Sequence, residues 1–368
     1  MNYNTPPHKE EIEITVIGTG GGYGECIILK MGEKDWVIID SCVNPITKES
    51  LAITYLTALQ VDIASDVKFI LCTHWHDDHI RGISELLNLS VNADFVMSKV
   101  NDKEKFLQLV ALDSGKISKS SNSTTIEFSK CLEIQSKRNR PIKSALCDRL
   151  LYKNLYNNKD FKIISLSPSD LTINDFDTEI STLITDFGQS NRQIIINTPN
   201  DKSVALLIQL GEDNIILGSD LEVGKNEQKG WLHIIKYCNS IQGEKSSIFK
   251  IPHHGSSNGY DKEIWDKLLH PNPISKITPW NRAKGLPQED MIKVYKKHTD
   301  KLYITSNSSN KSPKKRNLSN ALNKFLKSNR PSLEEIKYHF GIIRSRINYS
   351  EQNPTWKTEL FGEAIKLS

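Results

Sequence analysis

The chain has 368 residues, of which 38% are hydrophobic and 25% are charged, and its formal net charge is +4. These proportions are those of an ordinary folded domain, and they exclude collagen-like, low-complexity and wholly disordered chains. The length allows one large domain or one domain with an appendage, and the mild positive charge permits an anionic substrate without requiring one.

The chain begins with a polar segment, residues 1–10, which we expect to be disordered and which does not resemble a secretory signal. Apolar runs then predict strands over 12–17 and 36–41, separated by a glycine-rich turn over 18–24, and a helix over 50–59. No apolar stretch approaches the ~20 residues of a membrane-spanning helix, so we expect a cytoplasmic protein with no membrane partner.

Residues 74–79 read His-Trp-His-Asp-Asp-His and are the most informative segment of the chain. An apolar run over 67–72 predicts a buried strand before them, and helical spacing over 80–88 predicts a helix after them. The hexapeptide therefore lies at a strand-to-helix turn, where α/β proteins often place their chemistry. Its imidazoles and carboxylates are ligands that Zn²⁺ and related cations take.

Within the hexapeptide, His74 and His76 alternate as on an extended segment, so we expect them to bind one ion. Asp78 and His79 lie further round the turn and are placed to bind a second ion. A solvated polar loop is the alternative, which the strand and helix signals on either side disfavour. Cys72 precedes His74 by two residues, but its apolar setting indicates a packing role.

The remaining elements follow the same two periodicities. The patterns predict strands over 95–98, 162–168, 204–210, 214–217, 302–305, 342–347 and 357–361, helices over 103–112, 170–187 and 231–236, and an exposed loop over 113–123. The six cysteines (26, 42, 72, 131, 147 and 238) have no close Cys-x-x-Cys pairing, and we expect them to be reduced. His233 lies in the amphipathic run over 231–236, so we expect it to be structural.

Three motifs together resemble the metallo-β-lactamase superfamily: the hexapeptide after its strand, Gly-Ser-Asp at 218–220 after a strand, and His-His-Gly-Ser at 253–256 after another. Asp40, at the end of an earlier strand, resembles an aspartate that the family places near the site. The doubled histidine is typical of a branch that includes the hydrolase domain of bacterial DNA-uptake channel proteins and phosphorylcholine esterases. The resemblance covers roughly residues 11–260.

The resemblance implies an α/β (α+β) fold of the αββα sandwich type. We expect a hydrolase domain over residues 11–310 and a C-terminal extension over 311–368 that packs on the same domain. It also implies one or two zinc ions, with manganese as the alternative. The implied ligands are His74, His76, Asp78, His79, Asp220 and one of the pair His253 and His254.

Roles within this ligand set also follow from the resemblance. Asp220 would bridge two ions, and Asp78 would also orient the attacking water, so both carboxylates are the expected catalytic residues. Family members with a single histidine carry it immediately after the strand, which favours His253 over His254 as the ligand. The other histidine would then face the substrate or support the site.

One family ligand is missing, because no histidine lies between His79 and His233. Asn200, Asp201 or a water would complete the first ion site, or that site is weak or empty at rest. Alternatively, a single ion sits on the second set of ligands. Ser256 is a further candidate to contact substrate, and a site richer in oxygen ligands favours manganese.

The expected reaction is hydrolysis by a metal-activated water, most simply of a phosphodiester in nucleic acid, a cyclic nucleotide or a phospho-headgroup. The alternatives are a carbonyl hydrolase acting on a lactone or thioester, and a metal-binding sensor or partner subunit with a degenerate site. The basic segment over 311–316 is expected to be solvated, and Lys314, Lys315 and Arg316 are candidates to contact nucleic-acid phosphates. The sequence indicates no particular protein partner.

Overall fold

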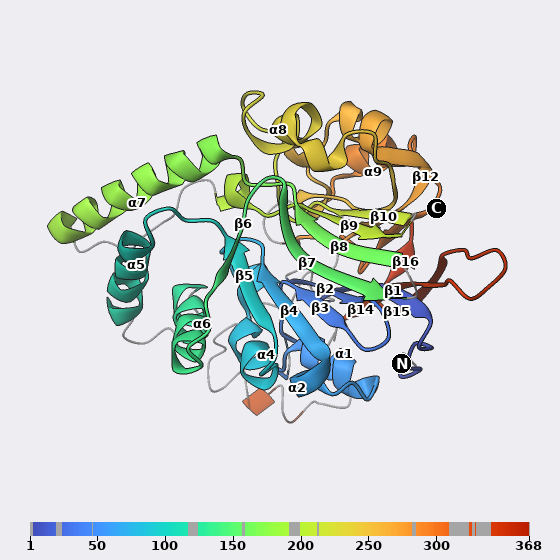
Figure 1. Ribbon diagram of the computed structural model, residues 1–368, viewed down its shortest axis with the longest axis horizontal. Coiled ribbons are helices and arrows are strands. Elements are labelled where there is room, and N and C mark those ends of the chain that lie inside the picture. The colour runs from blue at the N-terminus through green and yellow to red at the C-terminus, as the bar shows by residue number, and fades with distance from the viewer. Residues whose placement is uncertain are drawn as a thin grey trace.

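Two sheets lie face to face, and helices cover their outer surfaces (Figure 1). The structure is a computed structural model. It describes residues 3–19, 24–45, 47–116, 124–156, 159–190, 199–211, 213–281, 285–308, 324–325, 328 and 340–367. Buried apolar side chains form one core between the two sheets and one between each sheet and its helices. This layering is the expected αββα sandwich.

The first sheet has the strand order β15-β14-β1-β2-β3-β4-β5-β6. Its strands are β1 (Glu11–Gly18), β2 (Glu25–Lys30), β3 (Trp36–Ile39), β4 (Val67–Cys72), β5 (Asp94–Ser98), β6 (Lys143–Ala145), β14 (Gly341–Asn348) and β15 (Lys357–Gly362). The run from β3 to β6 is parallel, so the carboxyl ends of β3 and β4 meet at one edge. β14 pairs with β1 along its whole length, which places a strand from late in the chain inside the sheet.

The second sheet has the order β16-β13-β12-β11-β10-β9-β8-β7. Its strands are β7 (Arg149–Tyr156), β8 (Lys159–Ser165), β9 (Leu206–Leu210), β10 (Asp213–Leu217), β11 (Ser246–Lys250), β12 (Leu269–Ile277), β13 (Leu302–Ile304) and β16 (Ile365–Lys366). β10, β11, β12 and β13 are parallel neighbours, so the segments that follow them also meet at one edge.

The helices flank this pair of sheets. They are α1 (Leu51–Ala58), α2 (Ile63–Asp66), α3 (Asp77–Ile80), α4 (Ile83–Leu89), α5 (Lys103–Lys116), α6 (Thr124–Lys137), α7 (Asp170–Ser190), α8 (Gly230–Tyr237) and α9 (Glu289–Tyr295). Buried residues of α1, α4, α5 and α6 pack on the first sheet, and those of α8 and α9 pack on the second. No helix in the described ranges is long and apolar enough to cross a membrane.

Short turns of helix occur at η1 (Pro199–Lys202), η2 (Asn239–Ile241), η3 (His253–Gly255), η4 (Ser257–Gly259) and η5 (Ile264–Leu268). The single helix expected over 80–88 is two helices, α3 and α4. The break falls at Gly82, whose φ of 81° lies in the left-handed region that glycine tolerates best. Residues 113–116, expected to begin an exposed loop, belong to α5, which continues to Lys116, and the rest of that expected loop lies outside the described residues.

Two further expectations need correction. Residues 3–10 are not disordered: the backbone carbonyls of Tyr3 and Thr5 accept hydrogen bonds from Arg344 and Arg346 of β14. The cysteines are not all reduced either, because Cys147 and Cys238 form a disulfide. These two cysteines are separated by 91 residues in the sequence, so no local spacing pattern marks them as a pair. Cys26, Cys42, Cys72 and Cys131 are free and buried.

Candidate metal centre

The hexapeptide is held in place by the strand beside it. Asp40 follows β3, and its carboxylate accepts hydrogen bonds from the backbone N–H and the hydroxyl of Thr73, which follows β4. Trp75 is not a ligand: its ring stacks on Phe106 of α5 and contacts Phe176 of α7. The turn is therefore fixed by a buried carboxylate on one side and by aromatic packing on the other.

A first ligand set is formed by His74, His76 and Asp220, whose ligand atoms all lie within 4.8 Å of one another. Nε2 of His74 is 3.1 Å from Nδ1 of His76 and 3.7 Å from Oδ2 of Asp220. Burial lowers the pKa of both His74 and His76 below the usual range, so both imidazoles are neutral at neutral pH. Neutral imidazole is the form that binds a metal ion.

A second ligand set is formed by Asp78, His79, Asp220 and His254, and all four side chains are buried. Nε2 of His254 lies 3.2 Å from Oδ2 of Asp78 and 3.3 Å from Oδ2 of Asp220. Nε2 of His79 lies 3.5 Å from Oδ1 of Asp220. Asp220 is therefore common to both ligand sets.

Oxygen acceptors behind the second set fix the orientation of its two imidazoles. Nδ1 of His79 is 2.7 Å from Oδ2 of Asp40, and Nδ1 of His254 is 3.0 Å from the carbonyl oxygen of Thr278, which follows β12. Each Nδ1 thus carries a proton, and each Nε2 is directed toward the centre, where it can release its proton and bind a cation. Both Nε2 atoms and Oδ1 of Asp220 are buried and make no hydrogen bond within the described residues.

The charges in the second set also favour a cation. Burial disfavours protonation of His254, but the carboxylates of Asp220 and Asp78 outweigh it and raise the pKa of His254 to about 10. In the same way, Asp220, Asp40 and Asp78 outweigh burial and raise the pKa of His79 well above its usual value. Without an ion, the carboxylates therefore hold protons on both rings, which a divalent cation can replace. These orphaned atoms and charges fit a bound metal ion.

The sequence-predicted residues thus separate into two groups. The structure brings together His74, His76, Asp78, His79, Asp220 and His254, which we call the metal centre. His253 lies outside it: Nε2 is 3.0 Å from Nδ2 of Asn200, and Nδ1 is 3.5 Å from Oε1 of Glu222. The geometry therefore favours His254, rather than the expected His253, as the candidate ligand.

The reason lies in the backbone after β11. β11 ends at Lys250, and both His253 and His254 have positive φ angles, 46° and 52°. The second histidine faces the carboxylates of Asp78 and Asp220, and the first faces the side chains of Asn200 and Glu222 at the edge of the centre, which we call the rim. A sequence pattern that extends the strand by one more residue cannot anticipate this turn.

The other candidate residues lie at the edge of the centre or outside the described structure. Asn200 contacts His253 and Glu222, with Nδ2 3.3 Å from Oε1 of Glu222, and Asp201 belongs to neither ligand set. Ser256 is held by its backbone N–H, which bonds the carbonyl of His253. The positions 314–316, predicted to contact nucleic acid, lie outside the described residues.

Sequence reasoning missed two contributors. Glu222 follows Asp220 by two residues and contacts the rim histidine, a role that no motif marks. Thr278 acts through its backbone carbonyl, which no pattern of residue types reveals. Asp40 was expected near the site, and its carboxylate accepts the hydrogen bond that orients the ring of His79.

Comparison with known proteins agrees with this architecture. The sequence model of the metallo-beta-lactamase superfamily matches residues 19–103, which include β2 to β5 and the hexapeptide. The chain has the metallo-beta-lactamase fold. No curated protein matches it.

Several solved structures are similar to the chain at low sequence identity. A mutant of the beta-hydroxylase CmlA has a TM-score of 0.33 and 12% identity, over 67% of this chain and 36% of that one. AidC, a dizinc quorum-quenching lactonase, has a TM-score of 0.31 and 14% identity, over 53% and 55%. The hydrolase AbOPH of the beta lactamase superfamily has a TM-score of 0.32 and 15% identity, over 58% and 72%. The chain thus spans about a third to three quarters of these structures.

Proposed function

We propose that the protein is a metallohydrolase that cleaves a phosphodiester at a two-ion centre. The observation that carries the proposal is the position of Asp220. Its Oδ1 faces His79, and its Oδ2 faces His74 and His254, so one carboxylate lies between two ligand sets. Two-ion sites of hydrolases place their ions roughly 3.5–4 Å apart, a spacing that one shared carboxylate spans.

The chain's own residues have separate tasks in this proposal. Asp78 and Asp220 supply the negative charge that holds the cations, while Asp40 and Thr278 keep two imidazoles turned toward them. Zinc, or manganese as the alternative, would supply Lewis-acid charge and lower the pKa of a water molecule. His253, whose Nδ1 lies 3.5 Å from Oε1 of Glu222, is the residue we propose to contact the substrate beside the ions.

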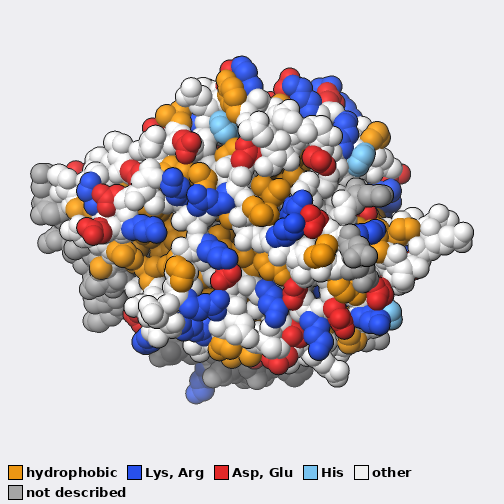
Figure 2. Space-filling model, viewed as in Figure 1, with side chains coloured by type: hydrophobic (Ala, Val, Ile, Leu, Met, Phe, Trp, Pro, Cys, Tyr) orange, Lys and Arg blue, Asp and Glu red, His pale blue; other side chains and the backbone are white. Residues whose placement is uncertain are grey.

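A phosphodiester is favoured over a carbonyl substrate for two reasons. A pair of ions stabilises both the attacking and the leaving oxygen of an in-line displacement at phosphorus. The doubled histidine also resembles the branch that contains phosphorylcholine esterases. The face in Figure 2 does not single out nucleic acid, because over its described part basic side chains are interspersed with acidic and hydrophobic ones.

The test combines metal analysis with a substrate screen. Protein purified without chelator, then loaded with zinc or manganese, is assayed on bis-p-nitrophenyl phosphate, supercoiled plasmid, cyclic nucleotides, a lactone and a thioester. We expect cleavage of a phosphodiester, and a loss in Asp220→Asn that exceeds the ~100-fold typical of residues that only orient a ligand. Asp66→Asn, a substitution at the end of α2, is the matched control.

Other outcomes have definite meanings. Cleavage of the lactone or thioester alone would replace the phosphodiester by a carbonyl substrate and keep the metallohydrolase. Bound metal without any cleavage would favour a sensor or partner subunit. Less than about half an equivalent of bound metal after reconstitution would contradict the proposal that these residues form a metal centre.

A further inference from the structure

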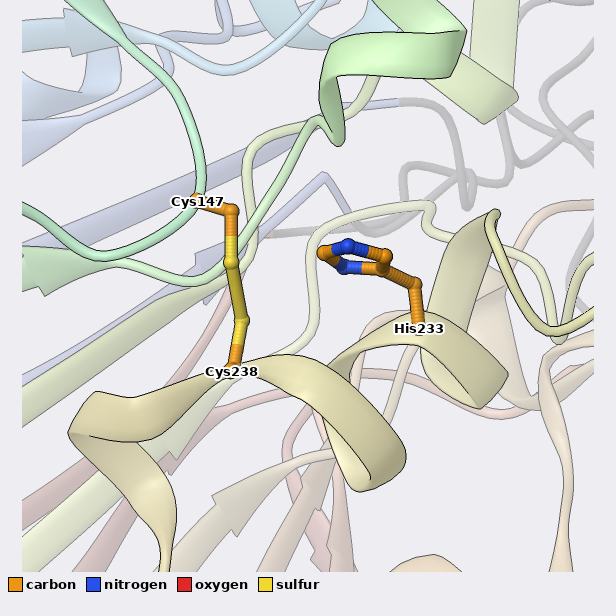
Figure 3. Close-up of side chains that lie close together, drawn as sticks. All are labelled: Cys147, His233 and Cys238. Atoms are coloured by element: carbon orange, nitrogen blue, oxygen red, sulfur yellow. A yellow bond between two sulfur atoms is a disulfide. The ribbon is translucent and has the colours of Figure 1, made fainter.

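A second group of metal-ligating side chains lies where Cys147, His233 and Cys238 meet, and it shares no residue with the metal centre. Cys147 lies between β6 and β7, His233 lies on α8, and Cys238 caps the end of α8. Figure 3 shows the ring of His233 beside the disulfide. The ligand atoms of the three residues lie within 4.8 Å of one another.

The surroundings of Cys238 accommodate a thiol as well as a disulfide. Its Sγ lies 3.1 Å from the carbonyl oxygen of Leu166. A thiol donates a weak hydrogen bond to such an oxygen, whereas a disulfide sulfur has no proton to donate. Reduction therefore gives this sulfur a partner that is already in place.

The imidazole of His233 is available to the two sulfurs. Its ring makes no hydrogen bond within the described part of the chain, and its packing contact is with the ring of Tyr237. Burial lowers the pKa of His233, with the carboxylate of Asp148 acting in the opposite direction. The ring is thus neutral at neutral pH and has a free lone pair.

We propose that Cys147, Cys238 and His233 bind one zinc ion when the disulfide is reduced. Zn–S bonds of ~2.3 Å and a Zn–N bond of ~2.0–2.1 Å, in tetrahedral geometry, place ligand atoms about 3.5–3.8 Å apart. This separation lies inside the observed 4.8 Å. The fourth position is left to water, and two thiolates select zinc over manganese.

The chemical steps balance with a thiol or phosphine as reductant. The reductant supplies two electrons, the S–S bond breaks, and each sulfur takes up one proton. Zn²⁺ then displaces both protons and forms two Zn–S bonds and one Zn–N bond. Peroxide reverses the process: it takes two electrons from the thiolates, the disulfide re-forms, and the zinc ion leaves. The two sulfur atoms cannot be bonded to each other and to the zinc ion at the same time, so the site holds either the disulfide or the ion.

Cobalt(II) distinguishes this site from the metal centre, whose ligands are nitrogen and oxygen only. Full-length protein is freed of metal, reduced with a phosphine and titrated with Co²⁺. We expect a thiolate-to-cobalt charge-transfer band that saturates when one Co²⁺ ion is bound at this site, and no such band in the oxidised protein. His233→Gln should weaken the cobalt affinity measured from this band at least tenfold, and Cys147→Ser should abolish the band.

Cys131→Ser, at a buried free cysteine elsewhere, is the control and should keep the band. A second readout avoids dependence on variants that fold poorly: zinc should protect Cys147 and Cys238 of the reduced wild type from alkylation, measured by mass spectrometry. Reduced wild type that takes up cobalt without a thiolate band, or alkylation unaffected by zinc, would overturn the proposal. Neither readout depends on hydrolytic activity, so the proposed function can fail while this site stands.

Discussion

At the scale of single residues, the metal centre depends on atoms that do not face it. Asp40 belongs to the group near His74 and His79, but its carboxylate is engaged by Thr73 on one side and by His79 on the other. The hydrogen bond from the Thr73 N–H fixes Oδ1 of Asp40 as an acceptor. Oδ2 is then the atom that determines which nitrogen of His79 carries the proton.

Asp40→Asn tests this arrangement. The Thr73 N–H retains the amide oxygen, so the amide NH₂ faces Nδ1 of His79 and cannot accept its proton. The proton of His79 moves to Nε2, where a metal ion should bind. We expect metal affinity to fall by about 10- to 100-fold, measured by competition with a chelating dye. Asp66→Asn should leave the metal affinity unchanged. An Asp40→Asn variant that binds metal as tightly as wild type would contradict the proposed role of Asp40.

The paired histidines make a second test at this scale. His254→Ala removes a ligand from the second set, so the protein should lose about one equivalent of metal. His253→Ala removes a side chain at the rim, so we expect full metal content and reduced turnover. Both variants are compared by elemental analysis after the same loading. Equal metal loss in the two variants would show that the roles of the neighbours are not separate.

The sequence could predict some of these contacts and could not predict others. The four candidate ligands of the hexapeptide lie close to Asp220, because the ends of parallel strands converge on one edge of a sheet. The choice between His253 and His254 depends on two left-handed backbone angles, and no residue type in the segment specifies them. The pairing of Cys147 with Cys238 depends on how α8 packs, which is a tertiary contact without a local signal.

At the scale of elements, β12 is tied to β1 and β14 of the other sheet by one buried lysine. Nζ of Lys276 donates hydrogen bonds to the carbonyls of Ile14, 2.9 Å away, and Ile343, 3.3 Å away. Burial, only partly opposed by Glu13, lowers the pKa of Lys276 to about 7. This ammonium group is therefore held between two sheets at the expense of its hydration.

The lowered pKa gives stability a pH dependence with a definite sign. Between about pH 7 and 10.5, the unfolded lysine keeps a proton that folded Lys276 has released. The free energy of unfolding should therefore rise with pH in this window, by at most ~1.4 kcal/mol for each pH unit. Lys276→Met lacks this contribution.

Urea unfolding at pH 6.5 and pH 9.5 measures the effect. Relative to wild type, Lys276→Met should be more stable at the lower pH than at the higher one. Other titrating groups are common to both proteins and cancel in the comparison. Lys267→Met, at an exposed position of η5, should show no such change. A stability difference that does not vary with pH would mean that Lys276 does not titrate in this window.

At the scale of the whole molecule, the two sheets share one arrangement of chemistry. In each sheet, a parallel run delivers its ligands just beyond the strand ends: residues 74–79 after β4, Asp220 after β10 and His254 after β11. The metal centre thus lies where the two sheets meet, and neither sheet alone provides a complete second ligand set. Binding of metal should consequently report on the docking of both halves.

The pairing of β1 with β14 has a consequence for how the protein is made. Glu11 is paired with Asn348 and Gly18 with Gly341, so a strand synthesised early has its partner only near the end of translation. At a synthesis rate of ~5–20 residues per second, the edge of β1 that pairs with β14 has no partner strand for on the order of tens of seconds. An open apolar strand edge during that interval invites capture by other chains. Ribosome-bound chains halted before residue 341 should accordingly be cleaved by protease within β1, whereas released full-length protein should resist cleavage there.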